Sequence, residues 1–298
     1  MGRALADSFA AAREMFEEID DALERNLSRL MWQGPDSELM LTENAQPAIM
    51  AASLAVVRVL ERETGFGFAK HARLVAGHSL GEYSALAAIG SFALGDAARL
   101  LRTRGRAMQE AVPPGEGAMS ALIGIDLADA RGAAEEASAQ GGICVVANDN
   151  APGQVVISGT SQTVERAAEM AKAKGARRAI PLPVSAPFHC PLMKPAAEKM
   201  REALAEVTIR PPAVPIVSNV TAAETNEPEI IRRLLVKQVT STVRWRESVL
   251  AFRDLGVDIT IEAGGKRVLT GMVKRIDPDL QTVSVDTPAD IEAFARTL

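Results

Sequence analysis

The chain has 298 residues, of which 47% are hydrophobic and 24% charged, and its net charge is −5. This composition is typical of a globular protein with one large domain or a domain that carries a smaller insertion. The negative charge argues against nucleic acid as a partner, and no apolar run approaches the ~20 residues of a membrane span. We therefore expect a cytoplasmic protein that binds neither nucleic acid nor a membrane.

The first half of the chain predicts helices around one short strand. The first 20 residues mix charged and apolar positions at helical spacing and lack the unbroken apolar centre of a signal peptide, so we expect a helix there. A second helix is predicted over 46–65, where Gly65 ends it. The apolar run 73–77 predicts a strand, a helix follows from about Leu80, and another covers 94–111. The "VPPGEG" segment after it is a plausible domain boundary.

The pattern changes after residue 117. Strands are predicted at 118–125, 143–148, 154–160 and 177–184, and helices at 127–140 and 161–175. The order β-α-β-β-α-β is that of a ferredoxin-like unit. We place an inserted ferredoxin-like subdomain of the α+β class at residues 117–186, so that residues 1–116 and 187–298 form one large α/β domain. Cys144 and Cys190 are far apart, which predicts two buried thiols.

The remainder of the chain again alternates helices with strands. Helices are expected at 191–207, near 227–239 and 244–256, at 266–276 and at the C-terminus, and strands at 216–220, 258–264 and 282–286. Such alternation predicts an α/β core with a mostly parallel sheet that has helices on both faces. Functional residues are then expected at the carboxyl ends of the strands.

Ser79 lies in the pattern Gly77-His78-Ser79-Leu80-Gly81, between a predicted strand and a predicted helix. In this context G-x-S-x-G favours a nucleophile elbow, in which a tight turn presents the serine hydroxyl at the edge of the sheet. The first N–H groups of the helix then point at the group that the serine attacks. We interpret Ser79 as a nucleophile rather than a structural turn residue.

A serine needs a base, and the chain has only three histidines. His78 adjoins the serine and is expected to pack beside the elbow, and His71 is expected to be exposed. His189, at the junction between the two predicted domains, is the candidate base. Candidate acids between the serine and the histidine, such as Asp126, Asp129 and Asp149, fall inside the inserted unit. We therefore expect a dyad in which a backbone carbonyl holds the imidazole.

The helix predicted over 94–111 carries one arginine on its apolar side. Arg99, Arg102 and Arg106 share one stripe, whereas Arg104 shares its side with Leu100, Leu101, Ala107 and Met108. An arginine that faces a core is costly unless it meets an anion. Two hypotheses stay open here: a buried salt bridge to an internal carboxylate, or a binding site for a substrate carboxylate.

The segments "GHSLGEYSAL", "RGRAMQEAV", "ANDNAPGQVVISG", "SAPFHCPLM" and "GGKRVLTGMVKRI" together resemble the malonyl-CoA:acyl carrier protein transacylases of bacterial fatty acid synthesis. The similarity covers essentially the whole chain in order, and it implies a hydrolase-like core with an inserted ferredoxin-like subdomain. It implies that Ser79 forms a malonyl ester and that His189 is its base. It further implies that the Leu80 N–H is an oxyanion donor and that the Gln238 carbonyl orients the histidine.

The resemblance also implies roles in substrate binding. Arg104 matches the arginine that pairs with the malonyl carboxylate, which favours the second hypothesis above. Gln46 and Asn148 match polar residues that line the site, and Phe188 resembles the form of this loop that selects malonyl over branched acyl groups. No cofactor or metal is implied, because coenzyme A enters as part of the substrate, malonyl-CoA.

The implied reaction is a ping-pong transfer, in which the phosphopantetheine thiol of an acyl carrier protein takes the malonyl group from the serine. That partner is acidic, so a basic patch is expected despite the net charge of −5. One candidate patch consists of Lys172, Lys174, Arg177 and Arg178.

One departure from the family pattern concerns the start of the chain. Members of the family begin with a strand and a G-Q-G-S-Q loop whose glutamine supplies a second oxyanion N–H, whereas this sequence begins at a point that matches the segment after that loop. We therefore expect lower activity than that of an extended chain, since loss of one donor costs about 100- to 1000-fold in rate.

Two alternative functions stay open. One is a serine hydrolase or thioesterase with the same elbow, and the other is an inactive acyl-binding scaffold.

Overall fold

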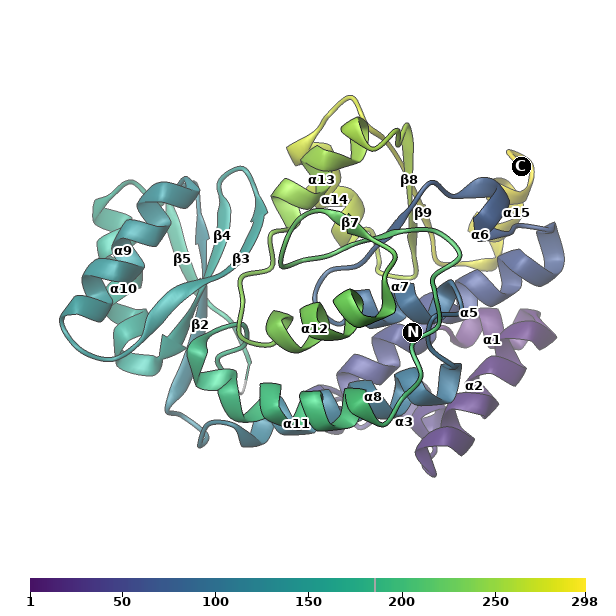
Figure 1. The fold of residues 1–298 in the computed structure, drawn as a ribbon, viewed down its shortest axis with the longest axis horizontal. Coiled ribbons are helices and arrows are strands. Elements are labelled where there is room, and N and C mark those ends of the chain that lie inside the picture. Colours follow the sequence, from purple (N-terminus) through teal and green to yellow (C-terminus); the bar gives the residue numbers. More distant parts are fainter. Residues whose placement is uncertain (185) are drawn as a thin grey trace.

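The computed structural model describes residues 1–184 and 186–298. Figure 1 shows two parts: residues 117–181, drawn in teal, form one end of the molecule, and most helices together with the remaining strands form the other. The protein is thus a mixed α/β structure. No helix in the described ranges is long and apolar enough to cross a membrane.

The N-terminal part is helical. The single helix expected in the first 20 residues is divided at Phe9, whose backbone is extended with φ −127°. The predicted helix that ends at Gly65 is confirmed, and Gly65 takes the left-handed conformation with φ 72°. The helices are α1 (Arg3–Ser8), α2 (Ala10–Leu23), α3 (Leu27–Gln33), α4 (Asp36–Leu39), α5 (Thr42–Thr64) and α6 (Phe68–His71).

The next segment contains the predicted strand, turn and helix. β1 (Val75–Ala76) leads through residues 77–80 into α7 (Gly81–Ala88), and α8 (Leu94–Glu110) follows. α8 packs against α5 and α2, and their buried side chains belong to the main hydrophobic core. The strand is shorter than predicted because the chain leaves the ladder at Gly77 to form the turn.

The middle of the chain follows the predicted order. It consists of β2 (Gly117–Ile123), α9 (Leu127–Ala139), β3 (Cys144–Ala151), β4 (Gln154–Thr160), α10 (Ser161–Ala173) and β5 (Arg178–Pro181). The sheet has the order β3-β4-β2-β5, and all neighbouring strands are antiparallel. Cys144 and Cys190 are buried free thiols, as predicted.

The last part returns to alternating helices and strands. Its elements are a short 3-10 turn (Pro191–Met193), α11 (Lys194–Ala205), β6 (Ile216–Val217), β7 (Glu224–Thr225), α12 (Pro228–Gln238), α13 (Trp245–Asp254), β8 (Ile259–Ala263), α14 (Val268–Ile276), β9 (Gln281–Val285) and α15 (Pro288–Ala295). β1 pairs with β6 in parallel, and β7 joins β6 in antiparallel orientation. β8 and β9 form a separate parallel pair.

The prediction of one large, mostly parallel sheet is wrong for the described residues. Their strands form three small sheets of three, four and two strands. The β1–β6 ladder spans only two residues on each strand, because β1 runs into the turn at Gly77 and β6 runs into the turn at Asn219. Apolar runs in the sequence thus marked the positions of strands but overestimated their length.

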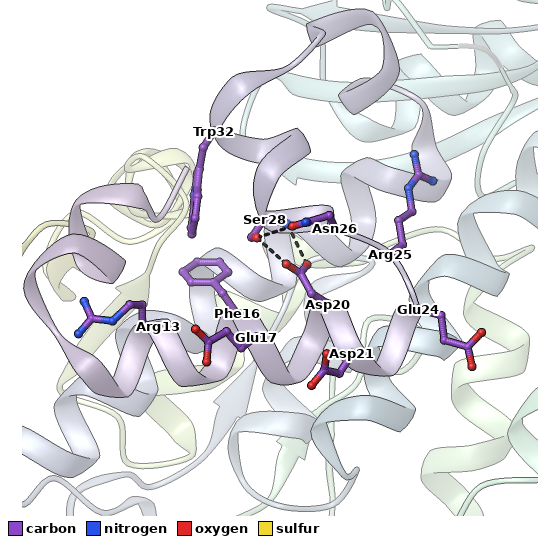
Figure 2. Close-up of a pocket in the computed structure, with 10 residues that line it drawn as sticks. All are labelled: Arg13, Phe16, Glu17, Asp20, Asp21, Glu24, Arg25, Asn26, Ser28 and Trp32. Atoms are coloured by element: carbon purple, nitrogen blue, oxygen red, sulfur yellow. Dashed lines mark hydrogen bonds between the residues drawn. The ribbon is translucent and has the colours of Figure 1, made fainter.

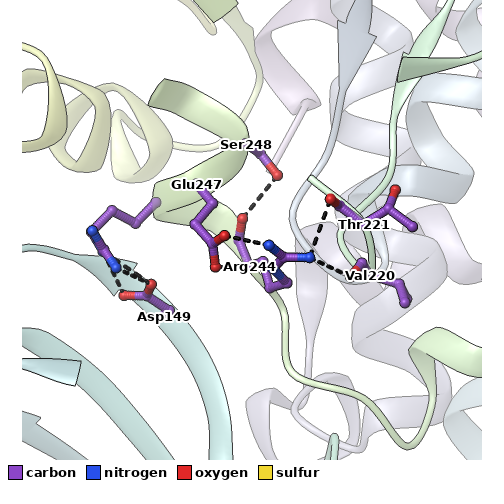
Figure 3. Close-up of polar contacts among 7 residues, drawn as sticks. Asp149, Val220, Thr221, Arg244, Glu247 and Ser248 are labelled. Carbon is purple, nitrogen blue, oxygen red and sulfur yellow. Dashed lines mark hydrogen bonds and ion pairs between the residues drawn. The ribbon is translucent and has the colours of Figure 1, made fainter. Parts of the chain in front are cut away.

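The middle unit is attached to the rest of the molecule through the edge of β3. The Val243 N–H donates to the Ala147 carbonyl at 2.8 Å, and the Asp149 N–H donates to the Val243 carbonyl at 3.0 Å. The Arg246 side chain adds an ion pair with the Asp149 carboxylate at 2.9 Å (Figure 3). These contacts bring Asn148 and the segment before α13 together at the junction.

Candidate active site

The backbone around Ser79 has the geometry of a nucleophile elbow. Ser79 has φ 54°, a left-handed conformation that is uncommon for residues other than glycine. A Cβ on Gly77 would lie 2.0 Å from the Gly81 carbonyl carbon, whereas a Cβ on Gly81 would meet no atom within 4 Å. Only glycine fits at position 77, so the interpretation of this segment as a sharp strand-to-helix turn is confirmed.

His189 lies directly against the serine. Its Nε2 is 2.8 Å from the Ser79 Oγ, and its Nδ1 is 2.9 Å from the main-chain carbonyl oxygen of Gln238. Because a carbonyl only accepts, Nδ1 carries the proton and Nε2 is free to accept one from the serine. His189 is 4% exposed, and burial together with the Arg104 charge lowers its pKa to about 3. The imidazole is therefore neutral at physiological pH.

The other two histidines do not reach Ser79. The His78 Nε2 lies 2.8 Å from Oδ1 of Asn150, which agrees with the expectation that His78 packs beside the elbow. His71 was expected to be exposed but is half-buried, because its ring stacks on Phe66 with centroids 5.4 Å apart. Along the described parts of the chain, no carboxylate hydrogen-bonds the imidazole of His189.

Arg104 is the buried cation of the site. It is 1% exposed, and it donates to Oε1 of Gln46 at 2.7 Å, to Oε1 of Gln238 at 2.9 Å and to the Ser79 Oγ at 3.1 Å. All of these acceptors are neutral, and Arg104 forms no ion pair with a described carboxylate. Burial lowers its pKa. The internal salt bridge considered as an alternative is thus not seen, and the guanidinium faces the nucleophile.

Three further predicted residues lie around this group. Leu80 is the residue before α7, and its N–H donates to no residue that the structure describes, so it is free to bind an oxyanion. Asn148 is buried on β3 opposite Val243, and its side chain forms no hydrogen bond with Ser79 or Arg104. Phe188 packs against both the main core and the cluster beneath the middle unit, next to His189.

Two residues of the site were missed by the sequence analysis. Glu82 is 2% exposed and accepts hydrogen bonds from the Asn219 N–H at 2.7 Å and from Nε2 of Gln238. The Asn219 side chain accepts from the Ser79 N–H at 2.7 Å and donates to the Gly77 carbonyl at 2.7 Å. Burial raises the pKa of Glu82 to about 7, although these hydrogen bonds and the Arg104 charge oppose the shift.

Local signals for these two residues were weak. A glutamate in the first turn of a helix is ordinary, since its charge complements the helix dipole. An asparagine near the end of a strand is an ordinary turn residue. The pattern "GHSLGE" did place a carboxylate three residues after the nucleophile, but the contact with Asn219 joins residues 137 positions apart.

A hollow of about 790 Å³ lies elsewhere, against α2 and α3 (Figure 2). It contains none of the predicted site residues. Its wall carries several carboxylates, which would repel an anionic acyl group, and Asp20 is already bonded to Ser28. The residues that line it are Arg13, Phe16, Glu17, Asp20, Asp21, Glu24, Arg25, Asn26, Ser28 and Trp32. We therefore do not assign the reaction to this hollow.

Residues 1–284 match the family model described as an acyl transferase domain, so the chain belongs to the acyl transferase family. It is 45% identical to the malonyl CoA-acyl carrier protein transacylase of Bacillus subtilis, a match that covers all of this chain and 92% of the relative. Within the family, the chain belongs with these transacylases. The matches extend over the whole chain and give no support to the expectation of a missing first strand and loop.

Solved structures agree with this assignment. An acyl-carrier-protein S-malonyltransferase from Bartonella henselae is 51% identical with a TM-score of 0.97, covering all of this chain and 94% of that one. A malonyl-transacylase solved in complex with its type II PKS acyl-carrier protein is 43% identical with a TM-score of 0.96, covering all of this chain and 95% of that one. The fold is therefore that of these solved structures.

Proposed function

We propose that the protein transfers the malonyl group of malonyl-CoA to the phosphopantetheine thiol of an acyl carrier protein in fatty acid biosynthesis. The observation that carries this proposal is the position of the Ser79 Oγ, 2.8 Å from the His189 Nε2 and 3.1 Å from the buried Arg104 guanidinium. A nucleophile thus lies between a base and a cation, and no described carboxylate contacts that cation. The names of its relatives support the substrate, and the reaction implies a cytoplasmic setting.

The first half of the reaction makes a malonyl ester. The neutral His189 Nε2 accepts the hydroxyl proton as the Ser79 Oγ attacks the thioester carbonyl of malonyl-CoA. The carbon–sulfur bond then breaks, and the coenzyme A thiolate takes the proton from His189 as it leaves. The Gln238 carbonyl, 2.9 Å from Nδ1, stabilises the imidazolium that forms between the two steps.

The oxyanion of each tetrahedral intermediate needs a donor that is already oriented. The Leu80 N–H fits this role because it donates to no described residue and opens the first turn of α7. The aligned peptide dipoles of the helix add positive potential at the same point. Catalysis therefore combines a base on one side of the Ser79 Oγ with a backbone donor on the other.

Selection of malonyl over uncharged acyl groups is assigned to Arg104. Its planar fork matches a carboxylate in two hydrogen bonds, and a buried cation that no carboxylate contacts directly gains more from an anion than an exposed one does. Gln46 and Gln238 hold the guanidinium at 2.7 Å and 2.9 Å. Asn148 and Phe188 are proposed to line the acyl pocket from the junction, where a bulky ring would crowd branched groups.

The second half of the reaction needs the carrier protein. Its thiol loses a proton to His189 and attacks the malonyl ester, which releases Ser79. The basic patch suggested for docking is partly neutralised, since Lys172 pairs with Glu169 at 2.6 Å and Lys174 with Glu136 at 2.8 Å. The patch thus loses much of its free charge, and its two arginines remain the better candidates.

The finer description of the fold is proposed on the same basis. The antiparallel order β3-β4-β2-β5 supports a ferredoxin-like subdomain at residues 117–186. The parallel β1–β6 pair and the elbow support a hydrolase-like core for residues 1–116 and 187–298, with helices around it. The site residues then come from the large domain except for Asn148.

A serine hydrolase or thioesterase remains the alternative. It would use the same elbow with water as the acceptor. Transfer is favoured because no described carboxylate contacts the Arg104 guanidinium and none lies beside His189. Incubation with malonyl-CoA followed by intact-protein mass and peptide mapping tests the proposal. We expect one malonyl group on Ser79, none in Ser79→Ala, and its release on adding acyl carrier protein.

Two outcomes of that experiment contradict transfer. Release of free malonate at the same rate with and without carrier protein would identify a hydrolase. Failure of folded protein to become malonylated would favour an acyl-binding scaffold. A matched control is Ser84→Ala, because Ser84 is a second serine near the elbow, is buried on α7, and its hydroxyl has no described partner.

A further inference from the structure

Glu82 has no part in the transfer chemistry described above. It lies in the first turn of α7, three residues after the nucleophile, and is 2% exposed. Burial of a carboxylate costs free energy unless hydrogen bonds replace its water. The groups that supply those hydrogen bonds therefore indicate what Glu82 holds in place.

One oxygen of Glu82 is connected to the elbow by hydrogen bonds. Oε1 accepts from the Asn219 N–H at 2.7 Å. The Asn219 side chain accepts from the N–H of Ser79 and donates to the carbonyl of Gly77, both at 2.7 Å. The amide of Asn219 thus spans the turn and ties its two ends together. Glu82 fixes the peptide from which that amide projects.

The other oxygen is connected to His189 through Gln238. Oε2 accepts from Nε2 of Gln238, which also donates to the Ser79 carbonyl at 2.9 Å. The main-chain carbonyl of Gln238 accepts from Nδ1 of His189 at 2.9 Å, and its side-chain Oε1 accepts from Arg104 at 2.9 Å. Gln238 therefore orients the imidazole through its main-chain carbonyl, and its side chain shares the guanidinium with Gln46.

We propose that Glu82 is a positioning residue of this site: through Asn219 and Gln238 its carboxylate aligns the Ser79 hydroxyl with the His189 imidazole for proton transfer. Glu82 touches neither the hydroxyl nor the imidazole. The inference rests on the proposed function, since malonylation of Ser79 is the reaction in which the alignment is measured.

Only an ionised carboxylate satisfies both branches. A carboxylate is acceptor-only, so its two oxygens accept from two donors at once. A glutamine at position 82 has one oxygen, and its NH₂ group would face the NH₂ group of Gln238. Either that donor stays unpaired or the Gln238 amide turns over, which withdraws its bonds to Ser79 and Arg104.

Asn219 is already anchored on its opposite side. Its carbonyl accepts from the Arg244 N–H at 2.9 Å, and the Arg244 guanidinium donates to the carbonyls of Val220 and Thr221 at 3.2 Å each (Figure 3). The turn after β6 is therefore held from the α13 side whether or not Glu82 is present. Loss of Glu82 frees the other side of the turn, which faces Ser79.

The test compares the wild type with Glu82→Gln, Asn219→Ala, the double variant and the control Ser84→Ala. Rapid quench and intact-protein mass give the rate constant of Ser79 malonylation per folded molecule, and a malonyl-CoA titration gives KM. We expect Glu82→Gln to lower the rate constant by about 100-fold, the loss typical of a small misplacement of reacting groups. KM should stay close to that of the wild type, because Gln46 still holds Arg104.

The double variant separates positioning from simple loss of stability. If Glu82 acts through Asn219, the double variant should be about as slow as the slower single variant, since groups that act as a unit are not additive. Slowing by the product of the two single effects would overturn the proposal. So would a wild-type rate constant in folded Glu82→Gln, whatever its melting temperature.

Two remaining outcomes are also decisive. If Glu82→Gln does not fold, Asn219→Ala keeps the Glu82 carboxylate, and wild-type kinetics in that variant would overturn the proposal. If the wild type is not malonylated, the proposed function fails, and reaction of Ser79 with phenylmethylsulfonyl fluoride replaces the assay. Equal rates of that reaction in the wild type and Glu82→Gln would then overturn the role of Glu82.

Discussion

Nη2 of Arg104 lies 3.1 Å from the Ser79 Oγ, so the proposed nucleophile and a buried cation are in contact before any substrate binds. The guanidinium donates otherwise to the neutral amide oxygens of Gln46 and Gln238. A cation that is 1% exposed and has no described carboxylate partner leaves a place for one negative charge close to the serine. That relationship supports an acyl group with its own carboxylate.

Arg104→Ala should therefore affect malonyl-CoA more than acetyl-CoA. Loss of one partner of a desolvated charge pair costs about 2–5 kcal/mol, so kcat/KM for malonyl-CoA should fall by at least ~30-fold. The smaller effect on acetyl-CoA follows because that group has no carboxylate. Arg106→Ala, on the exposed face of α8 and paired with Glu110, is the matched control. Equal losses with both substrates would show that Arg104 is structural.

The lowered pKa of His189 makes a prediction about stability and pH. The pKa of His189 is about 3 in the folded protein, whereas in the unfolded chain it is near 6.5, the ordinary value of histidine. The stability that the neutral histidine contributes is thus present above pH 6.5 and is lost as the pH falls toward 3. His189→Gln removes this dependence.

The measurement is urea unfolding of the wild type and His189→Gln at two pH values. Between about pH 7.5 and about pH 5.5, the free energy of unfolding of the wild type should fall by about 1.4 kcal/mol more than that of the variant. Titrating groups that are not linked to His189 by hydrogen bonds occur in both proteins and cancel in the difference. Parallel pH dependences would mean that folding does not lower the pKa of His189.

Gly77 and Gly81 allow a test of the elbow within one motif. A Cβ at position 77 would overlap the Gly81 carbonyl at 2.0 Å, and the neighbour is backbone that has no space to move. Gly77→Ala should therefore destabilise the protein strongly and abolish malonylation. Gly81→Ala meets no atom within 4 Å and should change stability by less than about 1 kcal/mol. Similar unfolding midpoints for both variants would contradict this account of the turn.

The parts of the site that sequence analysis predicted are those with a local cause. Gly77 and Ser79 form a turn whose geometry is set by neighbouring residues, and the helical period alone placed Arg104 on the apolar side of α8. His189 followed by elimination, because only three histidines were available. The role of the Gln238 carbonyl came only from the resemblance. Every residue has a main-chain carbonyl, so this role does not restrict the residue type.

The parts that could not be predicted depend on distant contacts. Glu82 and Asn219 each have an ordinary local explanation, and their common role appears only when 137 residues of chain bring them together. The extent of the sheets could not be predicted for the same reason. An apolar run such as the one around Ile216 marks a strand, but the length of its ladder is determined by its partner β1 and by the turn that follows.

The ion pair between Arg246 and Asp149 yields a prediction about how the two parts of the molecule stay together. The Asp149 side chain is 2% exposed, and both of its oxygens lie 3.0 Å from Nε of Arg246 (Figure 3). Arg246→Ala leaves a buried carboxylate unpaired, so it should cost about 2–3 kcal/mol in the free energy of unfolding.

Two further variants make this prediction specific. Arg62→Ala removes an exposed pair with Glu14 and should cost no more than about 1 kcal/mol. Adding Asp149→Asn to Arg246→Ala neutralises the stranded charge, so the double variant should be more stable than Arg246→Ala alone, as measured by urea unfolding. If the double variant is less stable than either single variant, the cost comes from lost packing of the arginine stem, and the ion pair does not join the middle unit to α13.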